Sequence, residues 1–295
     1  MAESSSTGKT KSAPEEIKKL VQETYAAAVA QRGGCCGQAS GCGTGAVRTD
    51  IVQLGRYSTE ELSALPADAV RNSFGCGNPL AFAGVRPGDT VLDIGSGAGV
   101  DVLLASRIVG PEGHVIGLDF TPEMIEKARQ NAAAAGVSNV EFRQGDAEQM
   151  PVEDGTVDWI ISNCVINLAP DKRKVFSEVF RVLKPGGRVS ISDIVTSNLP
   201  EDIRGEISLW SSCIAGAIDE TEYLRIMRES GLVEVDVTSR RYYDEASVQG
   251  LLDEVVTAAS ERKRARAVLL QRADLARAVW SAKIVGRKPA KGARV

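Results

Sequence analysis

Residues 91–99 read VLDIGSGAG, an apolar run that ends in glycines at positions 95, 97 and 99. The apolar run predicts a strand, and residues 99–109 have the spacing of an amphipathic helix. Glycine lets the chain turn sharply between the two elements, and it lets a ligand approach the main chain without interference from side chains. The stretch therefore predicts a strand, a ligand-binding turn and a helix in succession.

The same alternation of strand and helix continues along the chain. Further strands are expected at 114–119, 140–146, 157–164 and 187–195, and further helices at 121–136 and 171–183. Short strands that alternate with helices of this length predict an α/β fold, with a parallel sheet and helices on both faces. Two later runs, 232–239 and 279–289, predict an edge hairpin that is interrupted by a helical stretch at 245–279.

The flanking segments differ from this core in composition. The first residues are Ser, Thr, Lys and Gly with little to bury, and a helix is expected over 14–33. The boundaries we expect are a disordered tail at 1–14, an N-terminal helical and cysteine-rich segment at 15–74, a core at 75–240 with an insertion around 196–225, and C-terminal helices with the last strand at 241–295.

The bulk composition limits the functions that the chain can have. With a formal net charge of -4 and a pI near 5.4, the chain would repel a phosphate backbone, so we expect no nucleic-acid partner. No run is apolar enough to span a bilayer or to serve as a secretory signal, which predicts a cytoplasmic protein without a membrane partner. In a reducing compartment, six cysteines are expected to serve metal binding or catalysis instead of a disulfide framework.

Three aspartates follow successive strands of the predicted sheet. Asp93 ends the first strand, Asp119 ends the second, and Asp146 comes just after the third. The carboxyl ends of parallel strands form the rim on which ligands of open α/β sheets bind. We expect Asp119 to accept hydrogen bonds from two ribose hydroxyls and Asp146 to hold an adenine amino group. The alternative is that the glycines only make a tight turn and the aspartates cap turns or helices.

This spacing resembles class I S-adenosylmethionine-dependent methyltransferases, because the glycine register is G-x-G-x-G and not the G-x-G-x-x-G of dehydrogenases. The stretch RVLKPGGRVSISD at 181–193 is similar to the approach to the fifth strand in the same proteins. The resemblance implies a Rossmann-like, mostly parallel seven-stranded sheet with S-adenosylmethionine as cofactor. The cofactor-binding residues we expect are Asp93, Gly95, Gly97, Gly99, Asp119, Phe120, Asp146, Ala147 and Asn163.

Three cysteines from distant parts of the sequence are placed to converge on the same rim. Cys164 closes a predicted strand, Cys213 lies in the segment after the fifth strand, and Cys76 lies in a turn before the first strand. The alternative is that Cys164 and Cys213 are small buried apolar groups and that the position of Cys76 is incidental.

A second cysteine cluster lies in GGCCGQASGCG at 33–43, where nothing apolar is present to bury Cys35, Cys36 and Cys42. A structural zinc site would need about four ligands, and three cysteines without a nearby histidine fall short. An incidental glycine-rich linker stays open as an alternative.

The cysteine contexts SFGCGNP, SNCVINLAPDK and WSSCIAGAI, joined to a methyltransferase core, resemble the arsenite methyltransferases. The resemblance implies that Cys164 and Cys213, the latter in the insertion around 196–225, bind trivalent arsenic. It also implies that Cys76 belongs to the same catalytic arsenic site and takes part in disulfide cycling. We take Cys164 as its partner. The vicinal pair Cys35 and Cys36 corresponds to the residues that assist arsenic capture or reduction. Cys42 matches no role in that family.

The chemistry of these residue types agrees with the resemblance. Thiolates select soft, thiophilic centres, and trivalent arsenic with sulfur ligands keeps a lone pair that can attack a sulfonium methyl group without a general base. The only histidine, His114, starts the second strand and is interpreted as structural. Methylation oxidises arsenic formally, so a dithiol must return it to the trivalent state, and an external thiol reductant such as glutathione or thioredoxin must reset the dithiol.

The sequence thus predicts a monomeric arsenite methyltransferase that detoxifies arsenite or arsenic-thiol conjugates. One rival is a methyltransferase of the same fold that acts on a carbon or oxygen atom of a small metabolite. Another is a non-catalytic arsenic-binding thiol protein on a degenerate methyltransferase scaffold.

Overall fold

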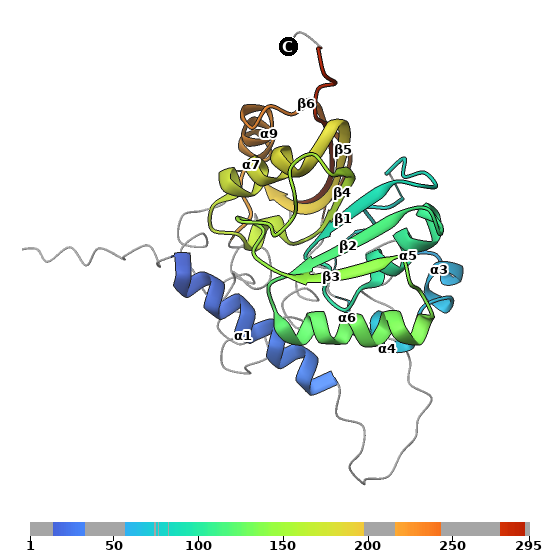
Figure 1. Ribbon diagram of the computed structural model, residues 1–295. Coiled ribbons are helices and arrows are strands. Elements are labelled where there is room, and N and C mark those ends of the chain that lie inside the picture. Colours follow the sequence, from blue (N-terminus) through green and yellow to red (C-terminus); the bar gives the residue numbers. More distant parts are fainter. Residues whose placement is uncertain are drawn as a thin grey trace, which may run out of the picture.

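The computed structural model describes residues 14–32, 57–73, 75, 77–81, 83–197, 216–242 and 278–292. In these ranges the chain forms a seven-stranded sheet with helices on both faces (Figure 1). The strands are β1 Thr90–Ile94, β2 His114–Asp119, β3 Val140–Gln144, β4 Val157–Asn163, β5 Leu183–Thr196, β6 Val233–Tyr242 and β7 Val279–Arg287. The helices are α1 Pro14–Arg32, α3 Thr59–Ser63, α4 Ala67–Arg71, α5 Val100–Val109, α6 Pro122–Ala135, α7 Lys172–Val182 and α9 Glu220–Glu229, with a 3-10 turn at Ile166–Leu168.

The strand order is β3-β2-β1-β4-β5-β7-β6. Strands β1 to β5 pair in parallel, whereas β7 pairs antiparallel with both β5 and β6. The mostly parallel seven-stranded sheet expected from the sequence is therefore confirmed. Strands β6 and β7 form the antiparallel pair that was expected as an edge hairpin. Because β7 lies between β5 and β6, only β6 of this pair is at an edge of the sheet. Of the helical stretch predicted at 245–279, only the last two residues are described, and Val279 already begins β7.

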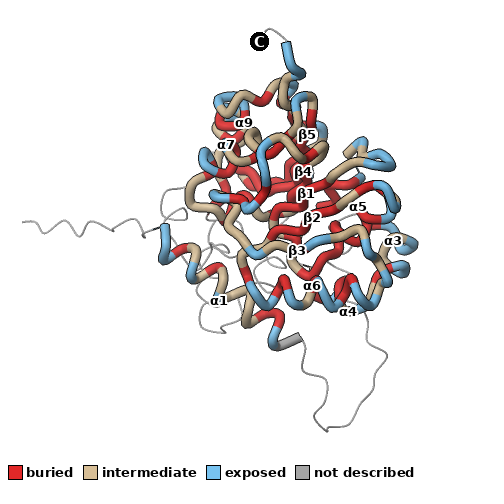
Figure 2. Tube along the Cα trace, viewed as in Figure 1, coloured by how far each residue is buried: buried red, intermediate tan, exposed pale blue. Residues whose placement is uncertain are grey.

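Strand β1 is buried on both faces, as expected for an inner strand of a sheet that helices cover on both sides. Val91 packs in one apolar cluster with residues of α5 and α6, whereas Leu92 and Ile94 pack in another with residues of α7 and α9. Figure 2 shows the buried residues concentrated along the sheet between these helix layers. The alternation of side chains in one short strand thus explains why helices cover both faces.

Local signals set the ends of the helices around the rim. Helix α6 begins with Pro122 at its first position and ends at Gly136, whose φ of 67° is left-handed. Asp171 accepts hydrogen bonds from the backbone N–H groups at the start of α7, and Asp219 does the same for α9. The sequence analysis did not anticipate α4 or α9. None of the described helices is long and apolar enough to cross a bilayer.

The expected segment boundaries fall partly outside the described residues. The tail at 1–13 and the cysteine cluster at 33–43 are not among them, nor are residues 198–215 of the insertion expected around 196–225. The end of that insertion, 220–225, forms the first part of α9, in which Tyr223 is fully buried against Phe176 of α7. This end of the segment therefore belongs to the apolar core.

Candidate functional site

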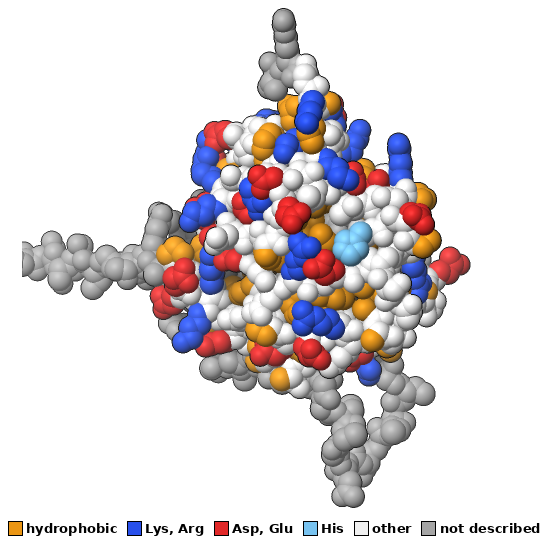
Figure 3. All heavy atoms as spheres, in the orientation of Figure 1, with side chains coloured by type: hydrophobic (Ala, Val, Ile, Leu, Met, Phe, Trp, Pro, Cys, Tyr) orange, Lys and Arg blue, Asp and Glu red, His pale blue; other side chains and the backbone are white. Residues whose placement is uncertain are grey.

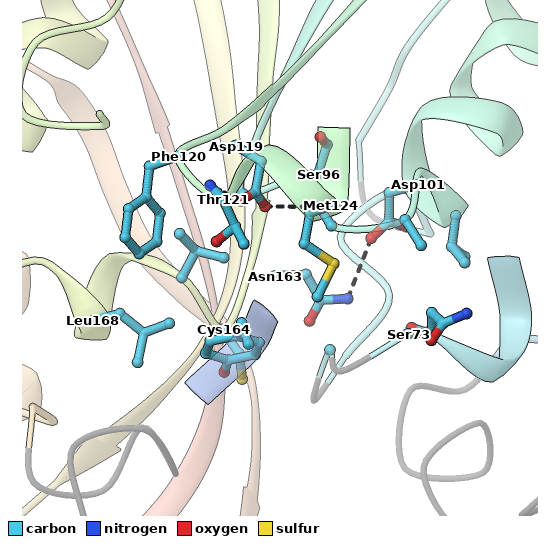
Figure 4. Close-up of a pocket in the computed structure, with 18 residues that line it drawn as sticks. Ser73, Ser96, Asp101, Asp119, Phe120, Thr121, Met124, Asn163, Cys164 and Leu168 are labelled. Carbon is cyan, nitrogen blue, oxygen red and sulfur yellow. Dashed lines mark hydrogen bonds between the residues drawn. The ribbon is translucent and has the colours of Figure 1, made fainter. Parts of the chain in front are cut away.

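The glycine turn lies directly beside the end of β2. The N–H of Gly97 donates a hydrogen bond of 3.0 Å to Asp119 Oδ2, and the N–H of Thr121 donates one of 2.9 Å to Oδ1 (Figure 4). Gly95 and Gly97 both have left-handed backbones, with φ of 76° and 51°. Since this conformation is costly for residues with a Cβ, glycine is required at these positions.

A cavity opens above this turn, and its empty space of about 670 Å³ includes the open solvent at its mouth. Its lining comes from the glycine turn, from the ends of β2 and β4 and from the segment before β1, and it includes Tyr25 of α1. Among the sequence-predicted site residues, the lining contains Gly95, Gly97, Asp119, Phe120, Asn163 and Cys164. The pocket therefore brings together six of the expected residues.

Two further predicted residues support the pocket without lining it. Asp93 is buried beneath the turn at 2% exposure. Gly99 has a φ of 94°, and a Cβ there would lie 3.5 Å from Ala128 and Phe142, so this glycine fits the turn against α6 and β3. Asp93 and Gly99 therefore shape the turn from beneath and do not line the pocket.

Asp146 and Ala147 follow β3 but are not part of the pocket lining. The Asp146 carboxylate instead forms an ion pair of 2.6 Å with Lys18 of α1, and Lys18 also contacts Glu148 at 2.8 Å. In the same helix, Gln22 Nε2 donates a hydrogen bond of 3.0 Å to the carbonyl oxygen of Phe120. Helix α1 is thus fastened to the segments that follow β2 and β3 beside the site.

Three carboxyl groups crowd around the glycine turn. Burial raises the pKa of Asp93 well above its usual value, and the nearby Asp101 and Asp119 carboxyls raise it further. Burial also raises the pKa of Asp101, to about 6, although hydrogen bonds from Tyr57 and Asn163 oppose the shift. The pKa of Asp119 is raised by burial as well. Burial therefore shifts these carboxyls toward the neutral form, and a positively charged group placed beside them would favour their ionised form.

Two buried polar atoms at the turn lack a hydrogen-bond partner among the described residues, namely Asp93 Oδ1 and Ser96 Oγ. Buried polar atoms are rarely left unsatisfied in folded proteins. A methyl group built on Gly97, which lines the pocket, would meet no protein atom within 4 Å. Because Ser96 lines the pocket and Asp93 does not, the turn offers a ligand free space at Gly97 and a polar partner in the Ser96 hydroxyl.

Cys164 follows directly after β4 and is the cysteine that the described part of the chain contains. It is 5% exposed, it lines the pocket beside Asn163, and its N–H donates to the Ser192 carbonyl oxygen at 2.8 Å. Its backbone has a φ of 59°, unusual for a residue with a side chain. Such a backbone costs free energy and is often found at functional sites.

The sulfur of Cys164 is engaged in a disulfide. The other cysteines with predicted roles, Cys35, Cys36, Cys76 and Cys213, lie outside the described residues, as does Cys42. The convergence of Cys76 and Cys213 on the rim therefore stays a prediction. Cys164 is buried, as expected for a small apolar group, and it also forms a disulfide, as expected for a cysteine in a thiol cycle.

His114 begins β2 and thus lies at the opposite end of that strand from Asp119. It is about half-exposed and its Nε2 lies 3.5 Å from Glu141 Oε2. Its position at the far end of β2 from Asp119 supports the structural interpretation of the histidine. On the face shown in Figure 3, where the histidine is visible, basic and acidic side chains are interspersed.

Several lining residues were missed by the sequence analysis. Tyr25 belongs to a helix 70 residues before the turn in sequence, and only tertiary packing brings it there. Thr121 and Met124 follow Asp119 at the start of α6, so a systematic reading of the strand-to-helix junction would have found them. Asp101 was not singled out, although an acid among apolar residues in the first turn of α5 is itself a signal.

Comparison with known proteins agrees with this geometry. Residues 86–231 match a family described as a methyltransferase domain. The solved structure of an arsenic (III) S-adenosylmethionine methyltransferase from Chlamydomonas reinhardtii is 31% identical, with a TM-score of 0.64, over 79% of this chain and 73% of that one. The chain belongs to the arsenite methyltransferase family.

Curated members of this family are also similar in sequence. The arsenite methyltransferase of Halobacterium salinarum is 43% identical over 235 residues, which make up 77% of this chain and 60% of that protein. The human arsenite methyltransferase is 36% identical over 213 residues, 69% of this chain and 54% of that protein. The chain therefore spans little more than half the length of the curated relatives it matches.

Proposed function

We propose that this chain transfers methyl groups from S-adenosylmethionine to trivalent arsenic held by cysteine thiolates. The observation that carries the proposal is the position of Cys164, directly beside the cavity above the glycine turn. Family membership supports the choice of arsenic, since the relatives named above are arsenite methyltransferases. A methyltransferase for a carbon or oxygen substrate needs no thiolate ligand beside the cavity, whereas Cys164 lines it.

The residues around the turn fit the proposed cofactor. S-adenosylmethionine, when bound, supplies a methyl group on a positively charged sulfur atom. The crowded carboxyls of Asp93, Asp101 and Asp119 favour such a cation, and Asp119 still has lone pairs for ribose hydroxyls beside its two backbone hydrogen bonds. Phe120 and the segment at Asp146 and Ala147 would border the adenine.

The protein's main task in this reaction is to position the arsenic. Soft thiolates hold soft centres, and the lone pair of trivalent arsenic is the nucleophile, so no general base is required. Cys164 and Cys213 are proposed as ligands, and Cys76 as the residue that forms a disulfide with Cys164 after a methyl transfer. Holding the reacting atoms about 3–3.5 Å apart and aligned can contribute several kcal/mol of barrier reduction.

The disulfide state of Cys164 supports a redox cycle at the same site. When methylated arsenic is reduced to the trivalent state, two thiolates lose the corresponding electron pair and become a disulfide. Two thiols from glutathione or thioredoxin then reduce that disulfide by exchange. We further propose that Cys35 and Cys36 capture arsenic from thiol conjugates, and that the protein works as a cytoplasmic monomer.

Arsenic speciation tests the proposal directly. The full chain is incubated with arsenite, S-adenosylmethionine and glutathione or thioredoxin with its reductase, and the arsenic species are separated over time. Methylated arsenic should accumulate only when both the cofactor and the reductant are present. Normal cofactor binding with no methylated arsenic under any of these conditions would instead favour a methyltransferase for another substrate.

A further inference from the structure

The side chain of Asn163, at the end of β4, forms a pair of hydrogen bonds with the main chain of Gly77. Its Nδ2 donates to the Gly77 carbonyl oxygen at 2.6 Å, and its Oδ1 accepts from the Gly77 N–H at 3.0 Å. The two residues are 86 positions apart in sequence. The amide therefore ties the segment before β1 to the carboxyl end of β4.

Two buried residues fix the orientation of this amide. Asn163 Nδ2 also lies 3.1 Å from Tyr57 Oη and 3.3 Å from Asp101 Oδ2, and Tyr57 Oη donates to Asp101 Oδ1 at 2.8 Å. Three oxygen acceptors thus surround the nitrogen, so a flipped amide would place its oxygen against them. Tyr57 and Asp101 are 9% and 6% exposed, which makes an unpaired polar atom costly there.

The main chain before and after position 76 is packed closely against the ends of two strands. A Cβ on Gly75 would lie 2.2 Å from Asn163 Nδ2, and a Cβ on Gly77 would lie 1.7 Å from Ser192 Oγ of β5. Asn163 and Ser192 face each other in the sheet register, and Cys164 comes next. The glycines are therefore required by close approach, and they bring this segment to the place where Cys164 leaves the sheet.

We propose that Asn163, aligned by Tyr57 and Asp101, is a positioning residue that clamps the main chain of Gly77, the residue after Cys76, to the strand end that carries Cys164. The clamp raises the effective concentration of the two thiols toward each other, because fixing the main chain removes part of the entropy cost of bringing them together. The inference rests on the roles of Cys76 and Cys164 in the proposed function. It assigns to Asn163 a role distinct from contact with the cofactor.

The thiol–disulfide equilibrium of the protein tests this inference without arsenic or cofactor. Protein dithiol and glutathione disulfide exchange to give protein disulfide and two glutathione molecules, and the Cys76 and Cys164 peptides are quantified by alkylation and mass spectrometry. The main variant is Tyr57→Phe, because the Tyr57 hydroxyl is not part of the cavity lining. Asn163→Ala is the stronger second variant.

We expect the equilibrium constant for disulfide formation to fall about threefold to tenfold in Tyr57→Phe and at least tenfold in Asn163→Ala, as for the loss of buried hydrogen bonds. Ser190→Ala is the matched control. It removes a 2.8 Å hydrogen bond from another buried side chain to Pro79, two positions beyond the clamp, and should leave the equilibrium within twofold. Equal shifts in Tyr57→Phe and Ser190→Ala, or no shift in Tyr57→Phe, would overturn the inference.

The result separates the clamp from the proposed function. A wild-type chain that fails to methylate arsenic, with a shifted equilibrium in Tyr57→Phe, would contradict the function and support the clamp. A wild-type chain that methylates arsenic, with an unshifted equilibrium in Tyr57→Phe, would support the function and contradict the clamp. Cofactor affinity measured by calorimetry should stay within twofold in Tyr57→Phe, and a large loss there would contradict a positioning role directed at the thiols.

Discussion

Lys18 of α1 and Asp146 after β3 form an ion pair of 2.6 Å across 128 residues of sequence. The pair is partly buried, and Glu148 extends it to a second carboxylate at 2.8 Å. Together with the hydrogen bond from Gln22 to the Phe120 carbonyl oxygen, it holds α1 over the cavity, where Tyr25 forms part of the lining. Helix α1 therefore contributes to the wall of the cavity through Tyr25.

Replacing Lys18 with methionine keeps the apolar stem of the side chain and removes its charge. We expect Lys18→Met to raise hydrogen exchange in α1 and to speed cofactor release about two- to fivefold, as for an ion pair worth ~0.5–1 kcal/mol. Stopped-flow fluorescence and hydrogen-exchange mass spectrometry measure the two effects. Lys19→Met is the control, because Lys19 is exposed and pairs only loosely with Glu23. Equal behaviour of both variants would contradict the role of α1 as a cover.

The glycine turn allows a comparison of two substitutions in one loop. Gly97→Ala places a methyl group in open space at the cavity, so it should lower stability by about 1–2 kcal/mol through its left-handed backbone and weaken cofactor binding more than tenfold. In Gly95→Ala the methyl would lie 2.1 Å from Val165 Cγ2, so the loss of stability should be larger. Thermal unfolding and calorimetry measure both. Undiminished cofactor binding in Gly97→Ala would rule out this turn as the cofactor site.

A buried carboxyl group on β5 predicts a pH dependence of stability. Asp193 is fully buried and faces the Lys172 ammonium, the Tyr223 hydroxyl and the backbone N–H groups of Asn167 and Ile194. Burial raises its pKa to about 7, although Lys172 opposes the shift. Since the folded chain binds this proton more tightly than the unfolded chain, the stabilisation is complete below the unfolded pKa near ~4 and is lost as the pH rises through 7.

The free energy of unfolding of wild-type protein relative to Asp193→Asn should therefore decrease between pH 4 and 8. The decrease is expected to be of the order of 2–4 kcal/mol, because each unit between the folded and unfolded pKa is worth about 1.36 kcal/mol. Urea titrations at several pH values measure it. A difference that stays constant over this range would show that Asp193 is ionised in the folded protein throughout.

Local patterns predicted the strands, most helices and the glycine turn. Strand β1 and helix α5 follow directly from an apolar run, left-handed glycines and an apolar helical face, all within about twenty residues. Asp119 was found for the same reason, because the end of a parallel strand has a fixed place in the sheet. These features are determined by residues that are close together in sequence, so they can be predicted from the sequence alone.

The features that were missed depend on contacts between distant residues. The ion pair of Lys18 with Asp146 and the hydrogen bonds of Asn163 with Gly77 join segments about a hundred residues apart. No local sequence pattern indicates which residues will form these contacts. Helix α9 is different, because its signal was present. Asp219 as a cap, buried side chains at Tyr223, Ile226 and Met227, and Gly231 after its end form a complete helix pattern.

The central claim is that cysteine thiolates hold arsenic beside the bound cofactor, and a single-turnover assay tests it most directly. Arsenite-loaded protein is mixed with methyl-labelled S-adenosylmethionine, and the label on arsenic is followed in wild-type protein, Cys164→Ser, Cys213→Ser and Cys35→Ser. We expect transfer to fall at least about 100-fold in the first two variants, as for misplaced reactants, with cofactor affinity unchanged, and to fall less in Cys35→Ser. Transfer to arsenic at the wild-type rate in Cys164→Ser would contradict the account.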